Sequence, residues 1–154
     1  KRMIASTVWN SLKSTLKNNT ALSKYVKNVH EIIRYDLTPE SFPCIMLQPV
    51  SDFEVERDMN QFKRVFLNVD IYAYAHYNIT DFHRSVVGDQ IIRGVFDINN
   101  DIRACLESSN TLGGIVYDVR AQQTEYADSN FPDVFPNRGL KIPIKILYSQ
   151  VDGK

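Results

Sequence analysis

Hydrophobic and polar residues alternate most strictly along residues 64–75. An extended chain with this period of two presents its apolar side chains on one side and the remaining ones on the other. The two sets are Val65, Leu67, Val69, Ile71, Ala73 and Ala75 on one side, and Arg64, Phe66, Asn68, Asp70, Tyr72 and Tyr74 on the other. An extended segment with a charged tip precedes this run, so residues 42–76 are predicted to form a long β-hairpin.

Two segments have helical spacing instead. Apolar residues recur every fourth position at Ile4, Val8, Leu12 and Leu16, which predicts an amphipathic helix over residues 3–17. A second helix is predicted over residues 81–107, with apolar positions at Phe82, Val86, Ile91, Val95, Ile98, Ile102 and Leu106. Asn99, Asn100 and Asp101 favour other conformations, so we expect them to break or bend this helix.

Further strands are predicted on both sides of the helices. Residues 115–122 and 140–148 alternate as two closing strands, and a short strand is expected within residues 29–34. Pro49 suggests an edge or a bend in the hairpin, and Pro143 suggests that one side of the last strand is open, because proline donates no ladder hydrogen bond. The predicted fold class is α+β in a single domain, residues 1–154, with an antiparallel sheet of about four strands and both helices on one face.

Composition adds few constraints on function. The 18 basic and 18 acidic residues cancel, so net charge does not indicate a nucleic-acid or membrane partner. Cys44 and Cys105 lack the spacing of a disulfide framework or a zinc site, and we expect them to be reduced thiols. No apolar run is long enough to span a membrane and no signal-peptide core is visible, so we expect a cytoplasmic product or a component of an assembled particle.

The sequence carries no motif for catalysis or for a cofactor. It has no phosphate-binding glycine loop, no GxSxG and no HExxH, so we predict that the chain is not an enzyme and binds no cofactor or metal. His76, Asp81 and His83 form one conceivable metal cluster, but an ordinary polar turn is the preferred interpretation. Cys105 lies on the apolar face of the second helix, which favours a buried structural thiol over a nucleophile.

Two charge patterns remain. Asp52, Glu54, Glu56 and Asp58 occupy every second position of the first hairpin arm and would share one face if that arm stays extended. We call these four residues the acidic stripe; a solvated surface is the simpler interpretation. Six basic residues precede Glu31, the first acidic residue of the chain. They are Lys1, Arg2, Lys13, Lys17, Lys24 and Lys27. They suggest either solvated lysines or docking to an acidic partner.

The whole pattern resembles phage tail terminator, or tail completion, proteins. The resemblance lies in the order of elements and in two stretches, "FPCIMLQPVSDFEVERD" from Phe42 and "FKRVFLNVDIYAYA" from Phe62. It implies a structural virion protein of the tail or neck, assembled in the host cytoplasm without membrane contact. Such a protein forms a ring, commonly of six subunits, that caps the tail tube, ends its polymerisation and provides the surface for head attachment.

The resemblance also suggests partners and contact surfaces. The expected partners are further copies of the chain, the tail tube protein and a head connector or neck protein. DNA would pass through the ring without specific binding, and the acidic stripe is a candidate for the lumen wall. Candidate contacts between subunits or with the tube are Phe53, Arg57, Phe131, Pro132, Phe135 and Pro136.

Two alternatives stay open. A head completion or neck adaptor protein would also be small, form a ring and lack catalysis. A small nucleic-acid-binding domain or an enzyme would instead use Tyr72, Tyr74 and Tyr77 as a stacking platform for bases.

Overall fold

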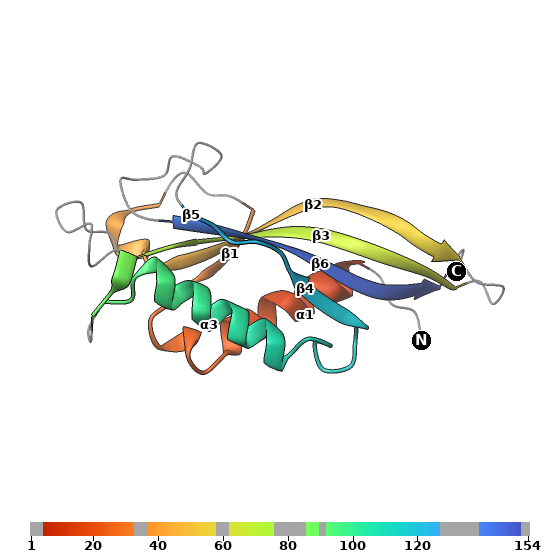
Figure 1. Ribbon diagram of the computed structural model, residues 1–154, viewed down its shortest axis with the longest axis horizontal. Helices are drawn as coiled ribbons and strands as arrows, with labels where there is room; N and C mark the ends of the chain where they lie inside the picture. Colours follow the sequence, from red (N-terminus) through yellow and green to blue (C-terminus); the bar gives the residue numbers. More distant parts are fainter. Residues whose placement is uncertain are drawn as a thin grey trace.

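In the part of the chain that the structure describes, two full α-helices pack on one face of a mixed six-stranded sheet (Figure 1). The computed structural model describes residues 5–32, 37–57, 62–75, 86–89, 92–126 and 139–151. The helices are α1 (Ala5–Asn18) and α3 (Val95–Ser108), and two 3₁₀ turns are η1 (Leu22–Lys24) and η2 (Pro39–Ser41). The strands are β1 (Val29–Glu31), β2 (Cys44–Arg57), β3 (Phe62–Tyr74), β4 (Asp118–Ala121), β5 (Glu125–Tyr126) and β6 (Gly139–Val151).

The strand order is β1-β2-β3-β6-β4, and β5 also pairs with β6. The strand β1 is parallel to β2, and every other described pair is antiparallel. The α+β class and the hairpin of β2 and β3 are therefore confirmed, whereas the expected all-antiparallel sheet of about four strands is only approximate.

The main core lies between the sheet and the two helices. Val8, Leu12 and Leu16 of α1 are buried, as the fourfold spacing predicted. The apolar side of β3 is buried as well, from Val65 to Ala75, so the alternation of this strand is confirmed. Both helices lie on the same side of the sheet (Figure 1).

A second, smaller core covers one end of the opposite face. It consists of Leu37, Phe42, Cys44, Met46, Tyr72 and Tyr74. Phe42 and Tyr74 meet edge to face, with ring centroids 5.9 Å apart. The segment around η2 therefore covers part of the second face, which the predicted arrangement, with both helices on one face, did not include.

The predicted helix over residues 81–107 is interrupted, because Val86 and Val87 are helical but the chain then leaves the helical conformation before Val95. The described helix α3 begins only at Val95, and Gly88 and Asp89 are not helical. Gly88 has a φ of 80°, and the Asp89 amide bonds to the Ile92 carbonyl at 2.8 Å. This local bond replaces a helical one and separates the two parts of the predicted helix.

The expected break at Asn99–Asp101 is also wrong, because α3 continues through these residues. Their side chains bond to neighbouring elements instead of competing for the backbone of their own helix. The Asn99 side-chain oxygen accepts a hydrogen bond from Thr124 at 2.6 Å, and the Asp101 carboxylate accepts one from Tyr25 at 2.7 Å.

Pro143 does not mark an open side of the last strand. The strand β6 lies inside the sheet, between β3 on one side and β4 and β5 on the other. The Pro143 carbonyl accepts a hydrogen bond from the Gln122 amide at 2.7 Å, so its backbone faces β4. The missing N–H of Pro143 therefore falls where pairing changes from β4 to β5, and the ladder with β3 stays complete.

The short strands β1 and β4 also differ in their bounds from the predicted strands within residues 29–34 and 115–122. Ile32 ends β1 early, because its φ of 67° turns the backbone into the left-handed region. The strand β4 starts at Asp118 and not at Ile115. None of the described helices is long and apolar enough to cross a membrane.

Candidate interaction surfaces

Three strands project beyond the helices. The strands β2, β3 and β6 continue past the ends of α1 and β4 (Figure 1). Pairing holds this projection together, because β3 and β6 form an uninterrupted ladder from Phe62 opposite Val151 to Tyr74 opposite Gly139. The chain thus presents an extended, hydrogen-bonded arm instead of a flexible loop.

One edge of this arm is open within the described part of the chain. The short strand β1 pairs only with Ile45–Leu47, and the Ile32 amide then closes the pairing with a 2.6 Å bond to the Leu47 carbonyl. Beyond Leu47 no described strand pairs with the outer side of β2. Two exposed apolar side chains lie at this transition, Ile32 at 58% and Val50 at 56% exposure.

The acidic stripe does not have the continuous alternation that its prediction assumed. The register of β2 against β3 shifts between Glu54 and Glu56, so these residues lie opposite Val65 and Arg64, which are consecutive in β3. Asp52 is exposed, and Asp58 lies outside the described residues. The role of the stripe stays a prediction.

The other predicted contact residues are placed only in part. Phe53 and Arg57 lie in β2, opposite Phe66 and Lys63. Outside the described residues lie Phe131, Pro132, Phe135 and Pro136, as well as the possible metal ligands His76, Asp81 and His83 and the aromatic residue Tyr77. The contact role of both sets of residues stays a prediction.

The outer face of the sheet does not offer the predicted stacking platform. Tyr72 and Tyr74 are 7% and 3% exposed, because the second core covers them. Further along this face, the Lys145 ammonium lies 5.9 Å from the centre of the Phe66 ring, and the Arg64 guanidinium lies 5.1 Å from the centre of the exposed Tyr117 ring. Cations thus already occupy positions over these two aromatic rings.

A polar cluster occupies the middle of the outer face. Lys141 forms an ion pair with Glu125 at 3.3 Å, across the ladder of β5 and β6. Burial raises the pKa of Asp70; the nearby Glu125 adds to this rise, and the Lys141 charge opposes it. Asp70 is thus less easily ionised than an exposed aspartate.

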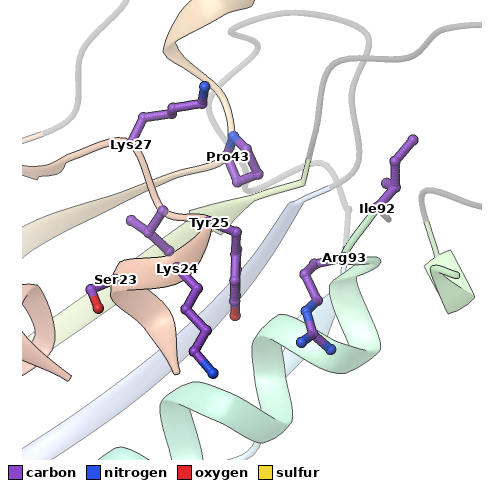
Figure 2. A pocket seen from close by; sticks show the side chains of 8 residues that line it. Ser23, Lys24, Tyr25, Lys27, Pro43, Ile92 and Arg93 are labelled. Carbon is purple, nitrogen blue, oxygen red and sulfur yellow. The ribbon is translucent and has the colours of Figure 1, made fainter. Parts of the chain in front are cut away.

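A basic pocket of about 460 Å³ lies between η1 and the start of α3. Figure 2 shows the Tyr25 ring between the side chains of Lys24 and Arg93, while Lys27 points away from it. The Tyr25 hydroxyl donates to Asp101 at 2.7 Å, and the Arg93 guanidinium lies 5.6 Å from the ring centre. Burial and the Asp101 bond hold the pKa of Tyr25 far above its ordinary value, so this phenol stays neutral and joins η1 to α3.

The pocket includes two of the basic residues noted in the sequence. Lys24 and Lys27 are exposed, whereas Lys13 forms an ion pair with Glu31 at 3.2 Å and helps join α1 to β1. Hydrogen bonds from Trp9 and Lys13 lower the pKa of Glu31. Because Lys24, Lys27 and Arg93 line it, the pocket can receive an anionic group by charge attraction. Its contacts were not evident from the sequence, because Tyr25 and Asp101 lie 76 positions apart.

Both thiols are buried and free, and the predicted burial of Cys105 is confirmed. Burial raises the pKa of Cys44 to about 12, which makes it a poor nucleophile at neutral pH. Within the described residues, no group of three His, Cys, Asp or Glu side chains is arranged to hold a metal ion.

No protein-family model matches the chain, and no curated protein matches its sequence.

Proposed function

We propose that this chain is a structural protein of a phage tail that forms a ring on the finished tail tube. The projecting arm of β2, β3 and β6, with the open edge of β2, is the observation that carries the proposal. A rigid arm with unpaired backbone groups is suited to extended contact with a neighbouring subunit. The similarity of the sequence pattern to tail terminators supplies the biological setting.

The mechanism of the proposed ring is surface complementarity. One face of the ring pairs with the last ring of tube protein, and the other face lacks the features that would accept another tube ring. Polymerisation therefore stops, and the second face becomes available to the head connector. The partners are further copies of the chain, commonly six in such rings, the tube protein and the connector.

Tail length tests this function. Particles from a producer that lacks this gene should carry tubes of uncontrolled, excessive length in negative-stain electron microscopy, because nothing ends tube growth. Normal-length tails without heads would support a neck adaptor instead. Normal infectious virions would contradict both structural functions.

The neck adaptor is the second candidate, and the basic pocket fits either function. Lys24, Lys27 and Arg93 line this pocket on the side of the chain that carries η1 and α3. An acidic surface on a head connector could dock there as readily as one on a tube. The nucleic-acid-binding alternative loses two of its three stacking residues, since Tyr72 and Tyr74 are buried.

The acidic stripe belongs to this proposal as a lumen surface. Repeated around a ring, carboxylates on β2 would repel the phosphates of DNA passing through it. Replacing Asp52 and Asp58 with Asn, and Glu54 and Glu56 with Gln, should leave assembly intact and slow DNA ejection. Unchanged ejection kinetics in the assembled variant would contradict the lumen position.

A further inference from the structure

We propose that the outer edge of β2 pairs with the outer edge of β4 from a second copy of the chain. This inference rests on the proposed ring and names the contact that joins its subunits. Copies joined in this way would share a continuous sheet that runs from one subunit to the next.

The hydrogen-bonding pattern identifies which groups of β2 face outward. The Ile45 amide bonds to Asn28 and the Leu47 carbonyl bonds to Ile32, so both backbones face β1. Strand alternation gives Pro49 the same direction. Its missing N–H therefore points to the open edge, where it removes no bond to β3.

The outward direction continues after the first register shift. Gln48 lies opposite Asp70 and Ser51 lies opposite Asn68, so these two partners are two residues apart in β3. Since alternate residues of β3 face β2, Ser51 faces β3 and the backbone of Asp52 faces outward. The segment between the two register shifts, Ser51–Glu54, is thus a short stretch of regular strand with an open outer side.

The strand β4 offers a matching edge. It has four residues, Asp118–Ala121, the length of the regular stretch in β2. It ends the strand order, and no described strand pairs with its outer side. The Gln122 amide faces β6, so alternation directs the backbone groups of Val119 and Ala121 outward.

Charge favours this pairing over pairing of β2 with itself. Two β2 edges would bring the acidic residues of one copy against those of the other, which destabilises a strand pair. The edge of β4 avoids this repulsion, because Asp52 lies opposite Leu67, on the side of the sheet where β4 carries the uncharged Val119 and Ala121. Pro49 and the two register shifts keep the β2 edge irregular, and such irregularity protects against unselective strand addition.

Pairing between two different edges has a consequence for assembly. Each bound copy still presents one free edge of each kind, so growth continues until a ring closes. Pairing between identical edges would end at a dimer. The two arrangements can therefore be separated by the size of the cross-linked product.

Engineered cysteines test the contact directly. Ser51 and Arg120 lie opposite Asn68 and Lys145, on the outer face of the sheet, so S51C and R120C would place thiols on the same side of the proposed junction. The native Cys44 and Cys105 are 1% and 2% exposed and give little background. The full chain carrying both substitutions is oxidised mildly at increasing concentration and analysed on a non-reducing gel.

The inference predicts a ladder of covalent dimers, trimers and larger products from the double variant. A mixture of the two single variants should give only a dimer that contains one copy of each. The matched control combines S51C with K17C, which lies on exposed α1, and should give no ladder. A covalent dimer from S51C alone would establish pairing of β2 with itself and overturn the proposal, as would the absence of cross-links or a chain that stays monomeric at every concentration.

A second variant tests the backbone bond. D52P removes one outward N–H and leaves the paired groups of β3 in place, so association should weaken about threefold to tenfold, as loss of one hydrogen bond predicts. D52N keeps the N–H and should associate like the unmodified chain apart from the charge change. Equal association of D52P and D52N would contradict the strand pairing, whereas the tail-length experiment would still decide the proposed function.

Discussion

Asp70 lies on the outer face of the sheet, opposite Pro143 of β6. Burial raises its pKa, so the protonated form is favoured in the folded chain. A carboxyl with a raised folded pKa stabilises the fold most below its ordinary pKa of about 3.9, and this contribution is lost as the pH rises through the folded pKa. At neutral pH the ionised Asp70 therefore destabilises the folded state slightly.

Replacing Asp70 with Asn should raise the free energy of unfolding at pH 7 by less than about 1 kcal/mol, because the residue is partly solvated. The gain should shrink as the pH falls to about 3, where the native carboxyl is protonated. Urea denaturation at both pH values measures this. The control D118N removes a partly exposed carboxylate that pairs with Arg120 and should give no gain. A loss of stability in D70N at pH 7 would show that the Lys141 attraction dominates.

The burial of single residues could be predicted from the sequence where it follows from the periodicity of their own strand or helix. The buried side of β3 follows from its period of two, which places every second residue against the helices. The burial of Tyr72 and Tyr74 does not, because Leu37 and Phe42 arrive from a separate segment to cover them. The partner of Asp101 was equally hidden, since Tyr25 belongs to another element.

At the scale of elements, the start of α3 depends on close packing of two short segments. A Cβ on Gly94 would lie 2.4 Å from the Val86 carbonyl oxygen and 2.6 Å from the Gly88 amide nitrogen. Both are backbone atoms, so the segments cannot adjust by moving a side chain. The packing of residues 86–89 against the first turn of α3 therefore requires glycine at position 94.

Replacing Gly94 with Ala should destabilise the chain by about 1–3 kcal/mol, as overpacking generally does. The matched control is G113A, since a Cβ there meets no atom within 4 Å and only the φ of 73° opposes it. Such a backbone conformation disfavours alanine by about 1 kcal/mol. Thermal unfolding of both variants measures the difference. If G94A were no less stable than G113A, the close approach at Gly94 would be contradicted.

The sequence predicted the type of most helices and strands better than the residues at which they begin and end. The α1 helix and the long strands have strong periodicity, and the structure confirms them. The ends of α3, β1 and β4 depend on backbone turns at Gly88, Ile32 and Gly114, where local hydrogen bonds and left-handed φ values override the apolar pattern. The parallel pairing of β1 is a long-range contact that no local pattern indicates.

For the whole molecule, the sheet is covered unevenly. The helices cover one face, and the second core covers one end of the other. The projecting arm lies beyond the helices and keeps the outer side of β2 open (Figure 1). This uneven cover suits a subunit that completes its sheet by joining another copy, which is the arrangement proposed for the ring.

Of the candidate contacts, the sequence predicted the hairpin arm but not the way in which it is open. The open edge results from the early end of β1 at Ile32 and from the irregular register around Pro49. Pro49 indicated an edge or a bend in the sequence, but the early end of β1 is not visible as a residue pattern. The matching edge of β4 required the strand order, which sequence alone did not supply.

The most direct measurement is a test of termination with purified components. Tail tubes from a producer lacking this gene are incubated with the purified chain, then with fresh tube protein, and their lengths are measured by electron microscopy. The proposed function predicts that treated tubes stop growing, whereas tubes incubated with the heat-denatured chain continue to extend. Equal extension of both samples would contradict the claim that this chain caps the tail tube.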